Sequence, residues 1–244
     1  MRRGFLLAAA GVVFGGRAMA QSFTDAQRAE IVDIIREALR RDPTILREAF
    51  SAIQAAEERD RAEAQRSGIV AQRAALFGTA GDPIRGNPRG DVTIVEFFDV
   101  RCPYCKRLHG EMTEVLRRDR NLRIIMKDLP ILGPQSVVGA RALLAAQRQG
   151  KYPEFYDALM RLRGEPTDEA IRAEAQRIGL DANRLFRDMQ DAAIQQRLDT
   201  NIALARTLQI EGTPALVIGD TLIPGALPAS QIERLVQAER ERRR

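Results

Sequence analysis

Apolar residues near the start of the chain recur at intervals of three and four, which places them on one face of a helix. Residues 24–41 show this spacing, and Thr24 followed by Gln27 fits a capping box. A second helix is expected from Pro43 or Thr44, interrupted by an almost wholly charged or alanine stretch at 57–66. The apolar positions of the two helices are Ile31, Ile34, Ile35, Ala38, Leu39, Leu46, Phe50 and Ile53. Two such helices cannot bury these side chains between themselves.

Further along, β-branched and aromatic runs predict strands, and the segments between them return to helical spacing. Strands are expected at 92–98, 122–127, 215–219 and 221–223, and helices at 106–118, over most of 136–208, and from Pro228 or Ala229 onward. Gly219-Asp220 is the expected hairpin turn. This order describes a small sheet with a helical block inserted in its middle.

The chain is expected to divide near residue 80. Residues 21–80 would form an N-terminal helical arm, and residues 81–244 a domain with its helical insertion at about 136–208. Glycines and prolines mark 78–90 as the clearest linker. The apolar face of the arm could pack against the domain or against copies of itself, and self-association is the favoured interpretation.

The first twenty residues have the pattern of a signal peptide. Arg2 and Arg3 precede an apolar stretch at 5–14, and Ala18-Met19-Ala20 is a small-residue cleavage site. The apolar stretch is too short to span a bilayer. Export by a Sec or a twin-arginine signal, and hence a periplasmic location, is expected.

Removal of this segment changes the charge of the protein. The whole chain carries 38 basic and 33 acidic residues, and three of the basic ones lie in the first twenty, which leaves a net charge of about +2. Basic and acidic residues alternate along the expected helices, so nucleic-acid binding has little support.

The two cysteines of the chain lie together as Cys102-Pro103-Tyr104-Cys105, directly after an expected strand and before an expected helix. A first cysteine that begins a helix gains thiolate character from unpaired backbone N–H groups. This arrangement suits dithiol–disulfide exchange, which requires no cofactor.

His109, the only histidine, follows on the same helix and is expected to be half-exposed. A different class of function remains open, in which Cys102, Cys105 and His109 bind copper or zinc.

Taken together, residues 88–240 resemble the DsbA-like branch of the thioredoxin superfamily. The ordered motifs are Glu96-Phe97-Phe98, Cys102-Pro103-Tyr104-Cys105-Lys106, Pro130-Ile131-Leu132-Gly133 and Gly212-Thr213-Pro214. The resemblance implies an α/β, thioredoxin-like fold with an inserted helical domain, preceded by the N-terminal helical extension. It implies a protein thiol–disulfide oxidoreductase.

The resemblance also implies roles for individual residues. Cys102 would be the exposed nucleophile and Cys105 the more buried resolving thiol. Pro103 and Tyr104 would tune the pKa of the nucleophile and take part in substrate binding. Thr213-Pro214 resembles a cis-proline turn that would lie against the cysteines and bind the client peptide.

Two of these assignments have simpler alternatives. Glu96 resembles a buried carboxylic acid that assists proton transfer at Cys105, but a glutamate in a strand can also face water. Without the resemblance, Pro214 would be a proline at the start of a strand.

The arm at 21–80 resembles the helical oligomerisation region of ScsC-type proteins. That resemblance implies a homo-oligomer, with a trimer suspected, and disulfide isomerase activity on exported client proteins with cysteines. The alternative is a DsbA-like oxidase, which a membrane redox partner would re-oxidise.

Overall fold

The computed structural model describes residues 23–78 and 80–243, so the expected signal peptide at 1–20 lies outside the described residues. The chain divides into two compact units between Glu57 and Glu58. Within the described ranges, no helix combines the length and the apolar character needed to cross a membrane.

The N-terminal unit contains α1 (Asp25–Arg41) and the beginning of α2 (Thr44–Ala71). The capping box predicted at Thr24 and Gln27 is present, with the Gln27 backbone N–H donating to the Thr24 hydroxyl. Within the described part of this unit, no side chain of α1 is buried. The large apolar side chains of this unit are therefore exposed, among them Ile34, Ile35, Phe50 and Ile53.

The larger unit is built on a five-stranded mixed sheet with the order β1-β3-β2-β4-β5. β2 (Val92–Phe98) is the central strand, parallel to β3 (Leu122–Asp128) and antiparallel to β4 (Ala215–Ile218). β5 (Thr221–Pro224) follows β4 through the predicted hairpin turn, where Gly219 has a φ of 59°. A positive φ at this position favours glycine.

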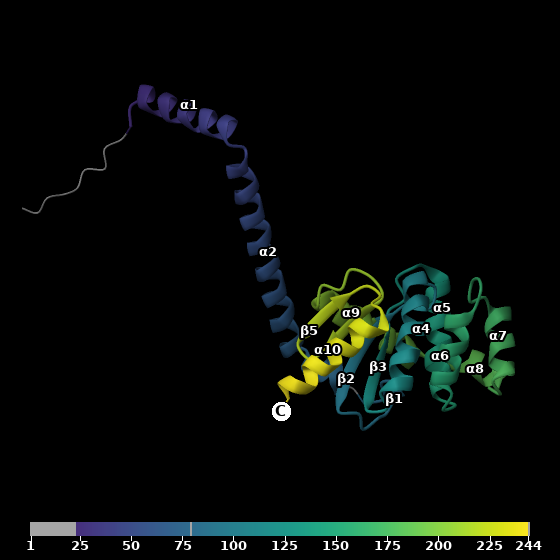
Figure 1. The fold of residues 1–244 in the computed structure, drawn as a ribbon. Coiled ribbons are helices and arrows are strands. Elements are labelled where there is room, and N and C mark those ends of the chain that lie inside the picture. Colours follow the sequence, from purple (N-terminus) through teal and green to yellow (C-terminus); the bar gives the residue numbers. More distant parts are fainter. Residues whose placement is uncertain (1–22, 79, 244) are drawn as a thin grey trace, which may run out of the picture. The chain divides into compact units, whose positions relative to one another are not determined.

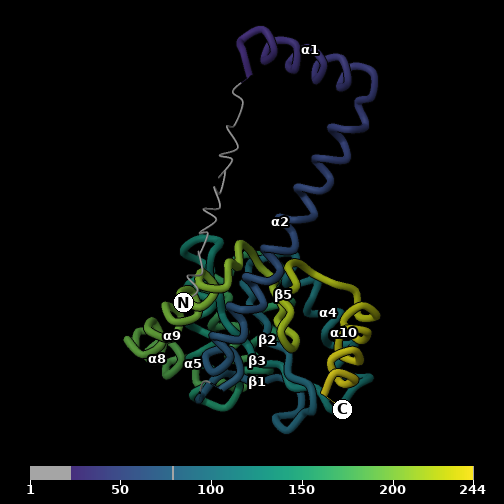
Figure 2. The backbone as a smooth tube through the Cα atoms, turned by 90° about the vertical axis from the view of Figure 1, so that its left-hand side faces the viewer, coloured from purple at the N-terminus to yellow at the C-terminus, as the bar shows by residue number. Residues whose placement is uncertain are grey.

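The side chains of β2 alternate between two hydrophobic clusters, because successive residues of a strand point to opposite faces. Ile94 and Phe98 contact the cluster that includes α4 (Pro103–Arg118) and α10 (Ala229–Arg242), whereas Val95 and Phe97 contact the cluster that includes α3 (Arg73–Phe77) and α9 (Ala192–Thr207). Figure 2 shows the strands between α9 on one side and α4 and α10 on the other. Glu96 shares the face of Ile94 and Phe98 and therefore points toward α4.

The predicted helical block is confirmed between β3 and β4 (Figure 1). It consists of α5 (Pro134–Gln147), α6 (Tyr152–Arg161), α7 (Asp168–Arg177), α8 (Ala182–Asp188) and α9. Buried side chains of α5 and α6 join the core cluster of α4, so the block extends the core on the α4 side of the sheet.

The segment at 78–90 differs from the expected linker because it contains β1 (Ile84–Gly86), which pairs antiparallel with β3. Before β1, Asp82 forms a buried ion pair with Lys127, whose Nζ lies 2.7 Å from the Asp82 carboxylate and also donates to the carbonyl of Ala75. A run rich in glycine and proline is therefore an integral part of the sheet, because its backbone and buried charges pair with β3.

Candidate active site

Cys102 lies at the N-cap of α4, and Pro103 occupies the first helical turn. The backbone fits this position because Pro103 has no N–H to leave unpaired, and the Cys102 carbonyl already accepts the first helical hydrogen bond, from Lys106, at 3.0 Å. The helix start therefore directs unpaired N–H groups toward the sulfur of Cys102. Both cysteines are free thiols in this structure.

The Thr213-Pro214 peptide bond is cis, as the resemblance implies, and it lies against the first cysteine. The carbonyl oxygen of Thr213 is 3.2 Å from Sγ of Cys102, although the two residues are 111 positions apart. Because of this contact the Cys102 side chain is buried, with 5% of the residue exposed, in contrast to the exposed nucleophile that was expected.

The two thiols have opposite acidities. A hydrogen bond from the Cys105 side chain, followed by the Thr213 side chain and backbone N–H groups, lowers the pKa of Cys102 to about 5, although burial opposes this shift. Burial raises the pKa of Cys105 well above its usual range, and the hydrogen bond to Cys102 adds to the increase. At neutral pH Cys102 is thus a thiolate and Cys105 a thiol.

Glu96 is fully buried, so its expected burial is confirmed and the solvent-exposed alternative is wrong. One carboxylate oxygen accepts a hydrogen bond from the Tyr156 hydroxyl at 3.1 Å. Burial raises the pKa of Glu96, while the charge of Arg85 and the hydrogen bond from Tyr156 lower it. A carboxyl group whose pKa is raised by burial can exchange a proton with a neighbouring buried thiol.

The surface around Cys102 carries exposed apolar side chains held by polar contacts. Tyr104 is 55% exposed, and Ile131 and Leu132 are exposed on the neighbouring loop. The carboxylate of Asp99 accepts hydrogen bonds from the backbone N–H groups of Ile131 and Leu132, and Arg101 pairs with Glu165 and with the Leu132 carbonyl. The apolar rim is consequently fixed in place beside the thiolate.

A cavity of about 550 Å³ begins at the cis-proline turn. Its lining includes Thr213, Pro214, Gln209 and Glu211, together with Arg61 and Gln65 of α2. The predicted binding residues at 213 and 214 are thus next to both the nucleophile and an open space.

His109 is 5% exposed, which corrects the expected half-exposed position. Its Nε2 lies 2.7 Å from the carboxylate of Asp157, and its ring packs edge-on against Tyr156. Across residues 23–78 and 80–243, no three His, Cys, Asp or Glu side chains come together as a metal site. The alternative of copper or zinc held by Cys102, Cys105 and His109 therefore has no assembled site.

Arg85 and Tyr156 belong to this site without a motif in the sequence that marks them. Arg85 lies in a segment rich in glycine and proline, and Tyr156 in a helical block with no motif of its own. The one available signal was that a buried Glu96 requires a polar partner.

Two family models match the chain. The DSBA-like thioredoxin domain matches residues 93–237, and the copper resistance protein ScsC N-terminal domain matches residues 27–63. The first covers both cysteines, Glu96 and the cis-proline turn, and the second covers the exposed apolar residues of α1 and of the first part of α2.

Solved structures agree with these matches. A thioredoxin-like oxidoreductase from Silicibacter pomeroyi is 41% identical, covering 69% of this chain and 98% of that one with a TM-score of 0.67. A linker-deletion variant of Proteus mirabilis ScsC is 26% identical, covering 92% and 100% with a TM-score of 0.67. The thiol-disulfide exchange protein alpha-DsbA2 from Wolbachia pipientis is 30% identical, covering 71% and 95%, also with a TM-score of 0.67.

Among curated proteins, a Na(+)/H(+) antiporter NhaA from Salinispora arenicola is 30% identical over 139 residues, which is 56% of this chain and 21% of the antiporter. The chain thus spans about a fifth of the length of such relatives. The family match and the structural neighbours together support a thiol–disulfide oxidoreductase. The chain belongs to the DsbA-like thioredoxin domain family.

Proposed function

We propose that this protein exchanges disulfides with client proteins through Cys102 and Cys105. The observation that carries the proposal is the contrast between the two sulfurs. Cys102 lies at a helix start against the Thr213 carbonyl with its pKa lowered to about 5, whereas burial raises the pKa of Cys105. Cys102 is therefore the attacking thiolate, and Cys105 stays protonated until the second step.

The exchange has two steps. The Cys102 thiolate attacks a client disulfide, forms a mixed disulfide and releases one client thiolate. Cys105 then loses its proton and attacks Cys102, which closes the Cys102–Cys105 disulfide and releases the second client thiolate. Two electrons pass to the client, and the reverse sequence oxidises a client dithiol.

The client would bind across the cis-proline turn and the apolar rim. Thr213 and Pro214 offer backbone groups beside Cys102, and exposed Tyr104, Ile131 and Leu132 offer apolar contacts. An extended peptide can form backbone hydrogen bonds at the cis-proline turn and can pack its side chains against the exposed apolar residues. Pro103 shapes the helix start that presents the sulfur.

We further propose that the protein is an isomerase assembled as a homo-oligomer, a trimer, through α1 and the beginning of α2. The match of residues 27–63 to the ScsC N-terminal domain and the exposed apolar side chains of this unit support self-association. Several active sites held together would raise the local concentration of thiolate around a misfolded client. A DsbA-like oxidase, re-oxidised by a membrane redox partner, is the alternative.

The proposed location is the periplasm. The Arg2-Arg3 segment, the apolar stretch and the Ala18-Met19-Ala20 site support export. A structural neighbour from Salmonella enterica serovar Typhimurium, 32% identical, is described as a periplasmic thioredoxin-like protein. Fractionation of cells that express the full chain tests this, and retention of an uncleaved chain in the cytoplasm would contradict it.

Reactivation of a scrambled, fully oxidised multi-disulfide protein tests the activity. The reduced protein should restore the native disulfides, and Cys102→Ser should not. Cys105→Ser should accumulate mixed disulfides that a non-reducing gel resolves. Rapid oxidation of a reduced client without reactivation would favour the oxidase, and the absence of both activities would contradict the proposed exchange.

Light scattering on the full chain tests the assembly. Ile34→Glu together with Phe50→Glu should reduce the mass, because both side chains belong to the exposed apolar set of the N-terminal unit. Val70→Glu is the matched control, since Val70 is a similarly exposed apolar residue of α2 outside the ScsC-like match. A monomeric mass for the unmodified protein would refute the oligomer.

A further inference from the structure

Arg85 brings a positive charge into the core beside Tyr156 and Glu96. It belongs to β1, and only 6% of the residue is exposed. One nitrogen of its guanidinium lies 3.2 Å from the carboxylate of Asp157, which is half-exposed at the surface. The guanidinium carbon lies 4.6 Å from the centre of the Tyr156 ring, within the range of a cation–π contact. Arg85 is thus held on two sides.

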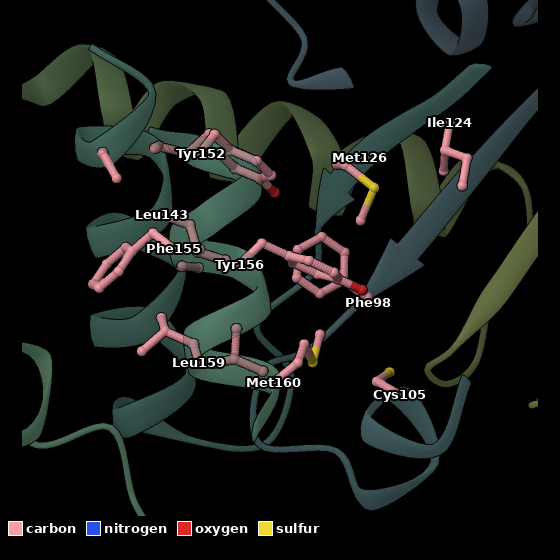
Figure 3. Packing of buried hydrophobic residues seen from close by; sticks show 14 of the residues in the cluster. Phe98, Cys105, Ile124, Met126, Leu143, Tyr152, Phe155, Tyr156, Leu159 and Met160 are labelled. Atoms are coloured by element: carbon pink, nitrogen blue, oxygen red, sulfur yellow. The ribbon is translucent and has the colours of Figure 1, made fainter. Parts of the chain in front are cut away.

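Tyr156 connects this cation to Glu96. Its ring packs edge-on against Phe98, with 5.0 Å between ring centres, and against His109. Figure 3 shows Tyr156 extending from α6 toward the sheet and lying beside Phe98. Because the rings fix its position, its hydroxyl donates to Oε1 of Glu96.

Two buried polar atoms at this place have no hydrogen-bond partner among the described residues: Oε2 of Glu96 and Nη1 of Arg85. They carry opposite charge, and Arg85 is the strongest Coulombic influence that lowers the pKa of Glu96. Arg85 therefore acts on Glu96 through the field of its charge and through Tyr156, with no direct hydrogen bond to the carboxylate. One carboxylate oxygen stays available to a proton.

The other groups that face Glu96 come from two helices. α4 contributes Cys105 and His109, and α6 contributes Tyr152 as well as Tyr156, each coupled electrostatically to the carboxylate. The register neighbours of Glu96 in the sheet, on β3 and β4, are the apolar residues Met126 and Leu216. Within the described part of the chain, Arg85 is consequently the one permanent cation of this group.

We propose that Arg85 and Tyr156 are positioning residues for the second step of exchange, because they keep Glu96 able to accept the proton that Cys105 must lose. The inference rests on the proposed function. In the mixed disulfide the Cys105 proton passes to the Glu96 carboxylate, and the Cys105 thiolate attacks Cys102. The bond between Cys102 and the client sulfur breaks, the client thiolate leaves with the electron pair, and Glu96 afterwards returns the proton to water.

The test uses the reduced full chain and 5,5′-dithiobis(2-nitrobenzoate) in a stopped-flow spectrometer. Attack of Cys102 on the reagent releases one coloured nitrothiobenzoate and leaves a mixed disulfide at Cys102. Attack of Cys105 on that mixed disulfide releases the second. The rate of the second release is measured against pH in the unmodified protein and in Arg85→Met, Arg85→Lys and Tyr156→Phe.

In Arg85→Met, the pH at which the rate of the second release reaches half of its maximum should be higher than in the unmodified protein. For each pH unit by which this midpoint rises, the release slows about tenfold when it is measured below the midpoint. Arg85→Lys should restore most of the rate because it restores the charge. Tyr156→Phe, which keeps the packing, should move the midpoint in the same direction. In a Glu96→Gln background, Arg85→Met should cause no further change.

Several results would overturn the inference. An unchanged midpoint in both Arg85→Met and Tyr156→Phe, or a change that persists in Glu96→Gln, would assign these residues to packing alone. If Arg85→Met does not fold, Tyr156→Phe and Arg85→Lys still decide the question. Absence of the first phase in the unmodified protein would refute the proposed function itself, whereas a normal first phase with unchanged second-phase profiles would refute only this inference.

Discussion

The acidity of Cys102 gives the sharpest prediction. Its pKa is lowered to about 5 from an ordinary value of 9.0. At pH 6 such a thiol is roughly 90% thiolate, whereas an ordinary one is roughly 0.1% thiolate. The rate of alkylation by iodoacetamide, measured from pH 4 to pH 10, should therefore rise to its plateau with a midpoint near pH 5.

The structure also ranks the causes of this acidity. The side-chain hydrogen bond from Cys105 is the largest, ahead of the Thr213 side chain and the backbone N–H groups of Cys105 and Tyr104. Cys105→Ala should raise the midpoint by about one to two pH units, and Thr213→Val by less, because each removes a contact that favours the thiolate.

Tyr104→Ala is the matched control. Only the backbone of Tyr104 contributes to the lowered pKa, and its side chain is exposed beneath the Arg107 guanidinium, 4.8 Å from the ring centre. The midpoint should stay near pH 5 in this variant. A midpoint between pH 8 and pH 9 in the unmodified protein, or no change in Cys105→Ala, would refute the reasoning.

Three further predictions concern stability, measured by urea unfolding of the full chain. Gly86→Ala should cost about 2 kcal/mol or more, because the φ of Gly86 is 77° and an added Cβ would lie 2.5 Å from a backbone oxygen of β3. Its control is Gly110→Ala, which has open space around the added Cβ and should be neutral or stabilising by up to about 1 kcal/mol. Lys127→Met should cost about 1 to 2 kcal/mol, because it removes one of the two cations that pair with the buried carboxylate of Asp82, while Arg197, 2.6 Å away, still pairs with it. Burial raises the pKa of Asp128 to about 7, so its ionisation opposes folding as pH rises from about 4 to about 7; Asp128→Asn should therefore lose less stability than the unmodified protein over that interval, and equal losses would contradict the assignment.

Elements whose signals lie within a few residues could be predicted from the sequence. The β-branched run at 92–98 is the central strand, the pair Thr24 and Gln27 caps α1, and Cys102 begins α4. In each case the residues that determine the local structure are adjacent or one helical turn apart, so a short stretch of sequence contains all the information that is needed.

Contacts between distant segments could not be predicted in this way. β1 has only three residues, too few to show the alternation that predicts a strand, and its pairing with β3 holds Arg85 in the sheet, where its charge acts on Glu96. His109 is buried because Asp157, 48 positions away, accepts its ring N–H, and Lys127 because Asp82 lies 45 positions before it. Tertiary pairing of this kind overrides the expectation that charged residues in helices and strands face water.

The separation of Cys102 and Thr213 by 111 residues has a consequence for the growing chain. Until the segment that contains Thr213 has been made and β4 has paired with β2, the sulfur of Cys102 lacks the Thr213 side chain, which is one of the groups that lower its pKa. An unfolded chain lacks the helix start and the Cys105 contact as well, so its Cys102 is a thiol of ordinary acidity. Completion of the fold therefore gives the two sulfurs their opposite acidities, so that the attacking thiolate and the protonated resolving thiol exist together only in folded molecules.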